Sequence, residues 1–263
     1  IKKLENSIDI NHQNDLIKFE EEFSNLIGNG NTISFAAGRM GFFALLKVLN
    51  IKKGDDIVIQ GSTCSVMVNA IHRIGANVVF ADIDKDTFGS CVDSIKNCIT
   101  RNTKMIVAQH SFGIPCRINP IVELAKDNNI FLLEDCALTV GSKINGTICG
   151  NFGDAALFST DHTKPINLLI GGMIYTKNQR LYSKLKDLRD KCQILPQWKQ
   201  KYIWKQLFFE RKYCTPKNYG KFNIASKIHS MTLFKGRAFL DEDFQLSTSS
   251  SYPYPSKFPS FLA

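Results

Sequence analysis

The segment IVIQGSTCSVMVNAIHRIGANVVF, residues 57–80, contains the pattern that decides the fold. It begins with consecutive apolar residues, continues through helix-like spacing at 66–74, and ends in a second apolar run at 77–80. Strands that read as continuous apolar runs are buried on both faces, and strands that alternate with helices form parallel sheets. This segment therefore predicts a strand–helix–strand unit in a sheet that helices cover on both sides.

The same alternation extends over most of the first 190 residues. Apolar runs predict further strands at 32–35, 105–108 and 130–133, and helices are expected at 14–26 and 120–128. We expect a three-layer α/β/α protein with a mostly parallel, mixed sheet. Right-handed crossovers in such a sheet place functional groups just past the carboxyl ends of the strands.

The composition describes a globular chain, since 44% of the 263 residues are hydrophobic and 22% are charged. The best apolar stretch, 166–176, is broken by glycines and is shorter than the roughly 18 residues that a membrane span needs. Residues 1–3 lead into acidic and polar residues, so no signal peptide is expected. The eight cysteines include no CxxC pair, so we expect no metal site. Without an export signal, we expect a cytoplasmic protein whose thiols are reduced.

The net charge of +9 is concentrated in one region. Residues 177–237 carry a net charge of +13 and the remainder of the chain −4. Within this region, residues 196–214 interleave aromatic with basic side chains, which in a helix is typical of an amphipathic surface with cationic flanks. Three interpretations stay open: core or subunit packing, steering of an anionic substrate, and peripheral membrane contact. No motif supports nucleic-acid binding, so none is expected.

Three features lie where strands of the expected sheet end, and the first is the turn Ala36-Ala37-Gly38-Arg39-Met40-Gly41. Backbone N–H groups at the start of a helix bind anions, and small residues let a phosphate approach closely. Small residues also suit any tight strand-to-helix turn, which is the alternative. The turn lacks the full GxGxxG pattern and an acid about 20 residues later, which argues against a nicotinamide dinucleotide site.

The second and third features carry charge. Leu132-Leu133-Glu134-Asp135 ends a hydrophobic strand with two carboxylates, and a buried aspartate needs a cationic partner such as a protonated ring nitrogen. A helix cap or an arginine pair is the alternative. The segment 153–164 brings Ser159 and then Lys164 onto a loop, a placement that suits a covalent link to a carbonyl cofactor. A solvated loop lysine is the alternative here.

Taken in order, these features and the segments between them resemble one family. The chain is similar, from about residue 33 to 191, to the DegT/StrS family of pyridoxal-phosphate-dependent nucleotide-sugar aminotransferases of fold type I. The matching segments include Lys53-Gly54-Asp55, His110-Ser111-Phe112-Gly113, Glu134-Asp135-Cys136-Ala137, Gly150-Asn151-Phe152-Gly153-Asp154 and Phe158-Ser159. The resemblance implies the large domain of that fold and pyridoxal 5′-phosphate as cofactor.

The resemblance also implies a role for each matched position. Lys164 is expected to hold the cofactor covalently and to shuttle a proton, and Asp135 to keep the pyridine nitrogen protonated. Ser159 and the turn at Gly38, Arg39 and Met40 are expected to bind the phosphate. Related sugar dehydratases carry histidine where this chain has Lys164, so the residue favours transamination.

Several positions depart from the family pattern. Leu138 stands where Gln or His contacts the cofactor's phenolic oxygen, and Cys64 stands where an aromatic ring stacks on the pyridine. Pro255 falls where an asparagine reaches the phosphate of the neighbouring subunit. The lost ring stacking and the lost hydrogen bond each cost about 0.5–1.5 kcal/mol. We expect looser cofactor binding or altered substrate use, with a non-catalytic binding or regulatory protein as the alternative.

The expected organisation is a cofactor-binding domain at 1–192 and an extension at 193–263 that forms part of a dimer interface or of an incomplete C-terminal region. The resemblance implies a small C-terminal domain that would continue past residue 263, so we expect a fragment, with a reduced protein as the alternative. The implied reaction moves an amino group, with glutamate as donor, to a nucleotide-linked keto-sugar for amino-sugar or polysaccharide biosynthesis. A homodimer is implied as well.

Overall fold

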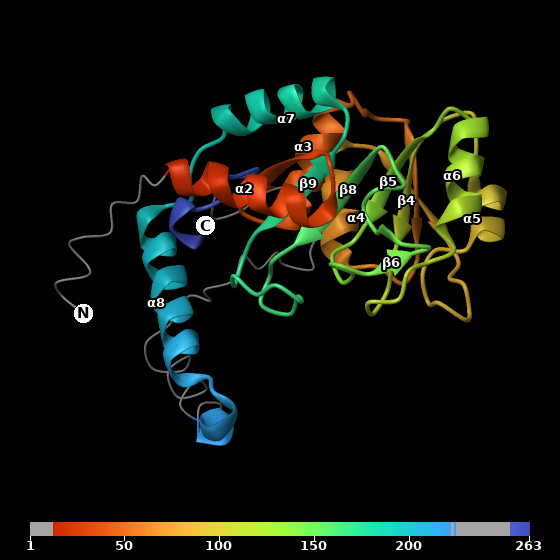
Figure 1. Ribbon diagram of the computed structural model, residues 1–263. Coiled ribbons are helices and arrows are strands. Elements are labelled where there is room, and N and C mark those ends of the chain that lie inside the picture. The colour runs from red at the N-terminus through yellow and green to blue at the C-terminus, as the bar shows by residue number, and fades with distance from the viewer. Residues whose placement is uncertain (1–12, 222–223, 225–252) are drawn as a thin grey trace.

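A single seven-stranded sheet organises the protein. The computed structural model describes residues 13–221, 224 and 253–263 (Figure 1). The strands are β1 (Asn31–Phe35), β2 (Asp56–Gln60), β3 (Asn77–Ala81), β4 (Thr103–Gln109), β5 (Phe131–Asp135), β8 (Ala155–Ser159) and β9 (Gly172–Thr176), in the spatial order β1-β9-β8-β5-β4-β2-β3. Strands β8, β5, β4, β2 and β3 are parallel, and β9 is antiparallel to both β1 and β8. The predicted mostly parallel, mixed sheet is confirmed.

Helices cover both faces of this sheet. One face packs against α3 (Gly38–Val48), α4 (Ser65–Ile74) and α7 (Gln179–Lys191). The other packs against α2 (Gln13–Ile27), α5 (Val92–Cys98) and α6 (Ile118–Asp127). The predicted three-layer α/β/α architecture is therefore confirmed, and the predicted helices and strands match the observed ones to within two residues at each end.

Strand β2 shows why continuous apolar runs led to this arrangement. All five of its residues are buried. Successive side chains of a strand point to opposite faces, so Ile57 and Ile59 join the cluster under α3 and α4, while Val58 joins the cluster under α5 and α6. A strand that contacts a helical layer on each side has no polar face to show in its sequence.

The end of the chain returns to the same core. The backbone N–H of Ala36 donates to the Ser256 carbonyl oxygen at 3.0 Å, and Lys257 forms an isolated bridge with Phe35. Phe258 and Leu262 are buried in the cluster that also contains α3. Residues after 192 thus contribute to the main core, and the predicted division at 192/193 stays a prediction.

Helix α8 (Gln197–Tyr213) extends away from the body of the protein (Figure 1). Its first turns are anchored: Ile203 is fully buried, and the Gln200 side-chain amide donates to the Leu195 carbonyl oxygen at 2.7 Å. Further along, aromatic and basic residues alternate around the axis instead of occupying opposite faces, which differs from the amphipathic pattern expected for residues 196–214. In the described part of the chain, no helix has both the length and the apolar character needed to cross a bilayer.

Candidate functional site

The predicted site residues come from strand ends that the topology brings to one edge of the sheet. β5 and β8 are parallel, and β1 is parallel to β8 because both are antiparallel to β9. Asp135 ends β5 opposite Leu157 of β8, and Ser159 ends β8 opposite Gly172 of β9. The start of α3, which follows β1, lies at the same edge. This convergence is the one that the sequence predicted for the carboxyl ends of parallel strands.

The start of α3 is packed tightly against this edge. Gly172 lies so close to Gly38 that an added Cβ would be 2.2 Å from the Gly38 backbone nitrogen. A Cβ added to Gly38 would be 3.6 Å from the Ser159 Cβ, so Ser159 is its direct neighbour. The N-cap residue Ala37 provides no side-chain hydrogen bond to the first turn. A helix start without a side-chain cap is suited to bind an anion next to the Ser159 hydroxyl.

The neighbouring positions in this turn differ in what they offer. Arg39 is buried, and its carbonyl oxygen accepts a hydrogen bond from the Tyr254 hydroxyl at 3.3 Å. Met40 is fully buried, its backbone N–H donates to the Ala37 carbonyl oxygen, and its sulfur accepts from the Ser256 N–H at 3.3 Å. Met40 therefore packs in the core, and the start of the helix at Gly38 and Arg39 is closest to Ser159.

Asp135 has the environment of an acid that lacks a cation. Its side chain is buried, and one carboxylate oxygen accepts from the Ala137 N–H at 3.0 Å. Within the described residues it forms no ion pair at salt-bridge distance. Burial raises the pKa of this carboxyl, while the hydrogen bond from Ala137 and then the positive charge of Lys164 lower it. Such a group is stabilised by a cationic partner.

Lys164 lies on the loop that joins β8 to β9. Its backbone N–H donates to the Asp161 carbonyl oxygen at 2.9 Å, and the base of the loop is closed by hydrogen bonds from Thr160 Oγ1 to Ile170 and from Leu168 to Thr160. The side chain is half-buried, and its charge acts on Asp135. The structure therefore brings Lys164, the predicted covalent anchor, into the electrostatic neighbourhood of Asp135.

Two predicted contact positions carry side chains that offer little polar chemistry. Cys64 is the exposed N-cap residue of α4, and Leu138 is half-buried shortly after β5. The hydroxyls of the adjacent Thr63 and Thr139 are buried and have no hydrogen-bond partner among the described residues. Buried hydroxyls usually find a partner, so the Thr63 and Thr139 hydroxyls are two polar groups next to these positions that the described residues leave unsatisfied.

A buried network behind Asp135 was missed in the sequence. Glu134 is completely buried and accepts hydrogen bonds from the backbone N–H groups of Gly150, Phe152 and Gly153 and from His110 Nε2, at 2.6–3.2 Å. The adjacent pair Glu134-Asp135 at the end of a strand was the signal for it. Because adjacent residues of a strand point to opposite faces, the two carboxylates could not face the same site.

Glu134, His110 and Cys136 offer ligand atoms within 4.8 Å of one another. His110 Nδ1, however, accepts from the Cys116 N–H at 3.0 Å, so the imidazole carries its proton on Nε2 and donates to Glu134. A protonated nitrogen does not coordinate a metal. Burial, and next to it the negative charge of Glu134, raises the pKa of Cys116 and Cys149 to about 12 and also raises that of Cys136. The cluster is therefore a hydrogen-bonded network with protonated thiols.

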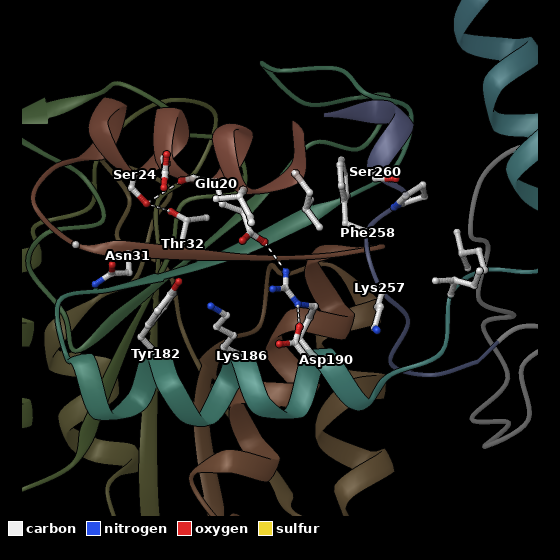
Figure 2. Close-up of a pocket in the computed structure, with 18 of the residues that line it drawn as sticks. Glu20, Ser24, Asn31, Thr32, Tyr182, Lys186, Asp190, Lys257, Phe258 and Ser260 are labelled. Atoms are coloured by element: carbon white, nitrogen blue, oxygen red, sulfur yellow. Dashed lines mark hydrogen bonds and ion pairs between the residues drawn. The ribbon is translucent and has the colours of Figure 1, made fainter. Parts of the chain in front are cut away.

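A groove of about 880 Å³ lies elsewhere, along the edge strand β1 between α2 and α7 (Figure 2). None of the predicted site residues lines it. Tyr182 and Lys186 project into it from α7, and Glu20 reaches toward it from α2 (Figure 2). Glu20 is paired with Arg189 at 2.7 Å and accepts from the Ser34 N–H at 2.8 Å. The charge of Glu20 is thus compensated within the protein, and the predicted site residues gather at the carboxyl edge instead.

The chain spans a little under half the length of the curated relatives it matches. GDP-perosamine synthase of Escherichia coli O157:H7 is 38% identical over 168 residues, which are 62% of this chain and 46% of that protein.

Solved structures show the same likeness. The aminotransferase from Psychrobacter cryohalolentis superposes with a TM-score of 0.66 at 29% identity, over 68% of this chain and 46% of that one. E. coli GDP-4-keto-6-deoxy-D-mannose-3-dehydratase with bound hydrated PLP gives a TM-score of 0.63 at 26% identity, over 66% and 46%. Residues 1–209 match the DegT/DnrJ/EryC1/StrS aminotransferase family. This chain belongs to that family.

Proposed function

We propose that this chain is the cofactor-binding part of a pyridoxal-phosphate-dependent aminotransferase that acts on a nucleotide-linked keto-sugar. The observation that carries the proposal is the buried Asp135 carboxylate, which lacks a cation at salt-bridge distance among the described residues and lies where the charge of Lys164 reaches it. A protonated pyridine nitrogen satisfies such a carboxylate, and a lysine amine beside it can hold an aldehyde.

The residues at the carboxyl edge fit the parts of this cofactor. Ser159 and the uncapped start of α3 at Gly38 and Arg39 would hold the phosphate, since helix starts bind anions. Asp135 would keep a proton on the ring nitrogen, and Lys164 would hold the cofactor covalently. The close approach of Gly172 to Gly38 leaves no room for a larger side chain there, which keeps this turn in place.

When bound, pyridoxal phosphate supplies an electron sink that stabilises negative charge at the α-carbon of an amino donor. In the proposed reaction the Lys164 amine removes the α-proton of the donor and later returns a proton to the product. Asp135 keeps its negative charge opposite the ring nitrogen throughout. Asp135 ends a strand, and hydrogen bonds close the base of the loop that carries Lys164, so both groups are positioned before the substrate arrives.

We further propose glutamate as the amino donor and amino-sugar or polysaccharide biosynthesis as the setting. Relatives that are named GDP-perosamine synthase and dTDP-4-dehydro-2,3,6-trideoxy-D-glucose 4-aminotransferase support the amino-sugar setting. The basic region at 177–237 would favour approach of an anionic nucleotide-linked sugar. A homodimer is part of the same proposal.

Reconstitution with pyridoxal phosphate tests the proposal. The full-length protein is expected to gain a visible absorption band that Lys164→Ala abolishes, while the surface control Lys126→Ala retains it. Glutamate is expected to bleach the band in a half-reaction, and Lys164→Ala to lower turnover at least about a hundredfold. Failure of the wild-type protein to bind the cofactor would overturn the proposal.

The same measurement addresses the alternative that Cys64 and Leu138 raised. A band that depends on Lys164 but does not respond to any amino donor would show a cofactor-binding protein without turnover. A band that bleaches with glutamate and recovers with a keto-sugar would show an aminotransferase.

A further inference from the structure

Glu134 is the most fully hydrogen-bonded carboxylate near the proposed site. It precedes Asp135 in β5 but points to the opposite face of the sheet. One of its oxygens accepts from the Phe152 and Gly153 N–H groups at 2.6 and 2.8 Å. The other accepts from the Gly150 N–H at 2.8 Å and from His110 Nε2 at 3.2 Å. Four donors fill the acceptor capacity of an ionised carboxylate.

His110 connects this network to Asp135 through the backbone. It follows β4, and its N–H donates to the Asp135 carbonyl oxygen at 3.1 Å, which extends the β4–β5 pairing by one residue. Its ring accepts from the Cys116 N–H and donates to Glu134, so both ring nitrogens are engaged and the orientation of the ring is fixed. One histidine thus holds the end of β4 to both acidic residues.

The loop on the other side of Asp135 depends on the same carboxylate. Residues 150–153 lead into β8, and glycine is required twice in them. Gly150 has a φ of +103°, and a Cβ on Gly153 would be 2.7 Å from the Leu132 carbonyl oxygen. The loop sets how β8 pairs with β5, where Leu157 lies opposite Asp135. Fixing the loop therefore also fixes the position of Ser159 relative to Asp135.

We propose that Glu134 and His110 are positioning residues that hold Asp135 at a fixed depth and orientation toward the cofactor ring. They do so by fastening β4, β5 and the loop before β8 to one buried carboxylate. This inference rests on the proposed function, because Asp135 needs a fixed orientation only if it faces a ring nitrogen. A charge-assisted network in a low-dielectric interior is stiff, which is what such a role requires.

Glu134→Gln provides the direct test. The carboxylate of Glu134 accepts from four N–H groups, whereas a glutamine amide has an oxygen that accepts and an NH₂ group that donates. At least one N–H group of the loop or of His110 therefore loses its partner. We expect the dissociation constant of pyridoxal phosphate to rise about tenfold or more. The pH midpoint of the visible band is also expected to move, because the orientation of Asp135 toward the ring nitrogen changes.

Asp56→Asn is the matched control. Asp56 is a buried carboxylate at the opposite edge of the same sheet, where it accepts from the Thr100 hydroxyl at 2.7 Å and from the Asn77 amide at 2.9 Å. Its replacement is expected to lower stability but to change cofactor affinity and the pH midpoint less than twofold. His110→Ala removes one hydrogen-bond donor and keeps the charge of Glu134. We expect the dissociation constant of pyridoxal phosphate to rise about threefold. This variant takes the place of Glu134→Gln if the latter does not fold.

The outcomes separate the two proposals. A wild-type protein without a Lys164-dependent band overturns the proposed function and this inference with it. A normal wild-type band with unchanged affinity and pH midpoint in Glu134→Gln and His110→Ala overturns the inference alone. The inference is also overturned if Asp56→Asn changes the cofactor affinity and the pH midpoint as strongly as Glu134→Gln does. The effect of Glu134→Gln would then reflect lost stability.

Discussion

Asp135 illustrates how a single residue can be costly to the fold and useful to the site. Its carboxyl is buried, and among the described residues only the Ala137 N–H hydrogen-bonds to it. Burial raises its pKa against the opposing effects of that hydrogen bond and of the positive charge of Lys164. A buried carboxylate without a close cation destabilises the folded state, and proteins retain such groups mainly where a ligand compensates them.

Replacing Asp135 with Asn should therefore stabilise the cofactor-free protein while weakening cofactor binding. A carboxyl whose folded pKa is raised contributes stability that is present below its unfolded pKa and is lost as the pH rises through the folded value. Asn keeps an acceptor for the Ala137 N–H but carries no charge. We expect Asp135→Asn to melt a few degrees higher than wild type at pH 8, with a smaller difference at pH 5.

Thermal melts of the cofactor-free proteins at the two pH values check this, together with a pyridoxal phosphate titration at pH 8. Asp161→Asn serves as a control on the neighbouring loop, where the half-buried carboxylate is paired with His162. A lower melting temperature for Asp135→Asn at pH 8 would contradict the idea that this carboxylate is uncompensated.

At the scale of elements, the site depends on how closely β9 approaches the start of α3. Gly172 begins β9, and its Cα lies against the Gly38 backbone. Ala37 also forms a bridge with Gly171, so the turn and the strand are held side by side. The position of the helix start therefore depends on the absence of a side chain at residue 172.

Gly172→Ala is expected to displace the start of α3. The new Cβ would be 2.2 Å from the Gly38 backbone nitrogen, and backbone atoms cannot move aside as a flexible side chain can. We expect the affinity for pyridoxal phosphate to fall about tenfold or more and the free energy of unfolding to fall by about 1–3 kcal/mol. Cofactor titration and urea unfolding measure the two effects.

Gly61→Ala is the corresponding control, because a Cβ there would meet only the Ala81 carbonyl oxygen at 3.8 Å, an ordinary contact. It should leave both quantities close to wild type. Equal behaviour of the two alanine variants would show that the contact between Gly172 and Gly38 does not position the helix.

At the scale of the whole molecule, the hydrophobic core includes residues from both ends of the described chain. Phe258 is buried and stacks on Phe19 of α2 with 5.4 Å between ring centroids. Leu195, just before α8, and Ile203, within α8, join the same cluster. Residues that are far apart in sequence thus stabilise one core.

Phe258→Ala should therefore destabilise the whole protein in a single transition. Removing a buried aromatic side chain costs about 3–5 kcal/mol, and the loss should appear in the main unfolding transition because the core is shared. Urea unfolding followed by far-UV circular dichroism measures it. Phe112→Ala, where the side chain is 75% exposed, should cost less than about 0.5 kcal/mol. Two separate transitions, with only the smaller one affected, would favour an independent extension at 193–263.

Sequence reasoning succeeded for elements whose signal is local. The buried strands were predicted because a strand covered on both faces has no polar alternation. The helix α7, by contrast, was not predicted, although Asn178 caps it with hydrogen bonds to the Arg180 and Leu181 N–H groups at 3.0 Å. Its sequence is dominated by charged residues, and only Leu181, Leu185 and Arg189 are buried, so a narrow apolar stripe had to be recognised among many exposed positions.

The sequence by itself determined the α/β architecture, the family, and the residue types that the site requires, because strand hydrophobicity and motif order are properties of the chain alone. The tertiary structure decided that Gly38 and Ser159 are neighbours, that the charge of Lys164 reaches Asp135, and that Glu134 faces away from them into a network with His110. These relations depend on strand order and register. Both arise from packing between segments that are distant in sequence, which no local pattern encodes.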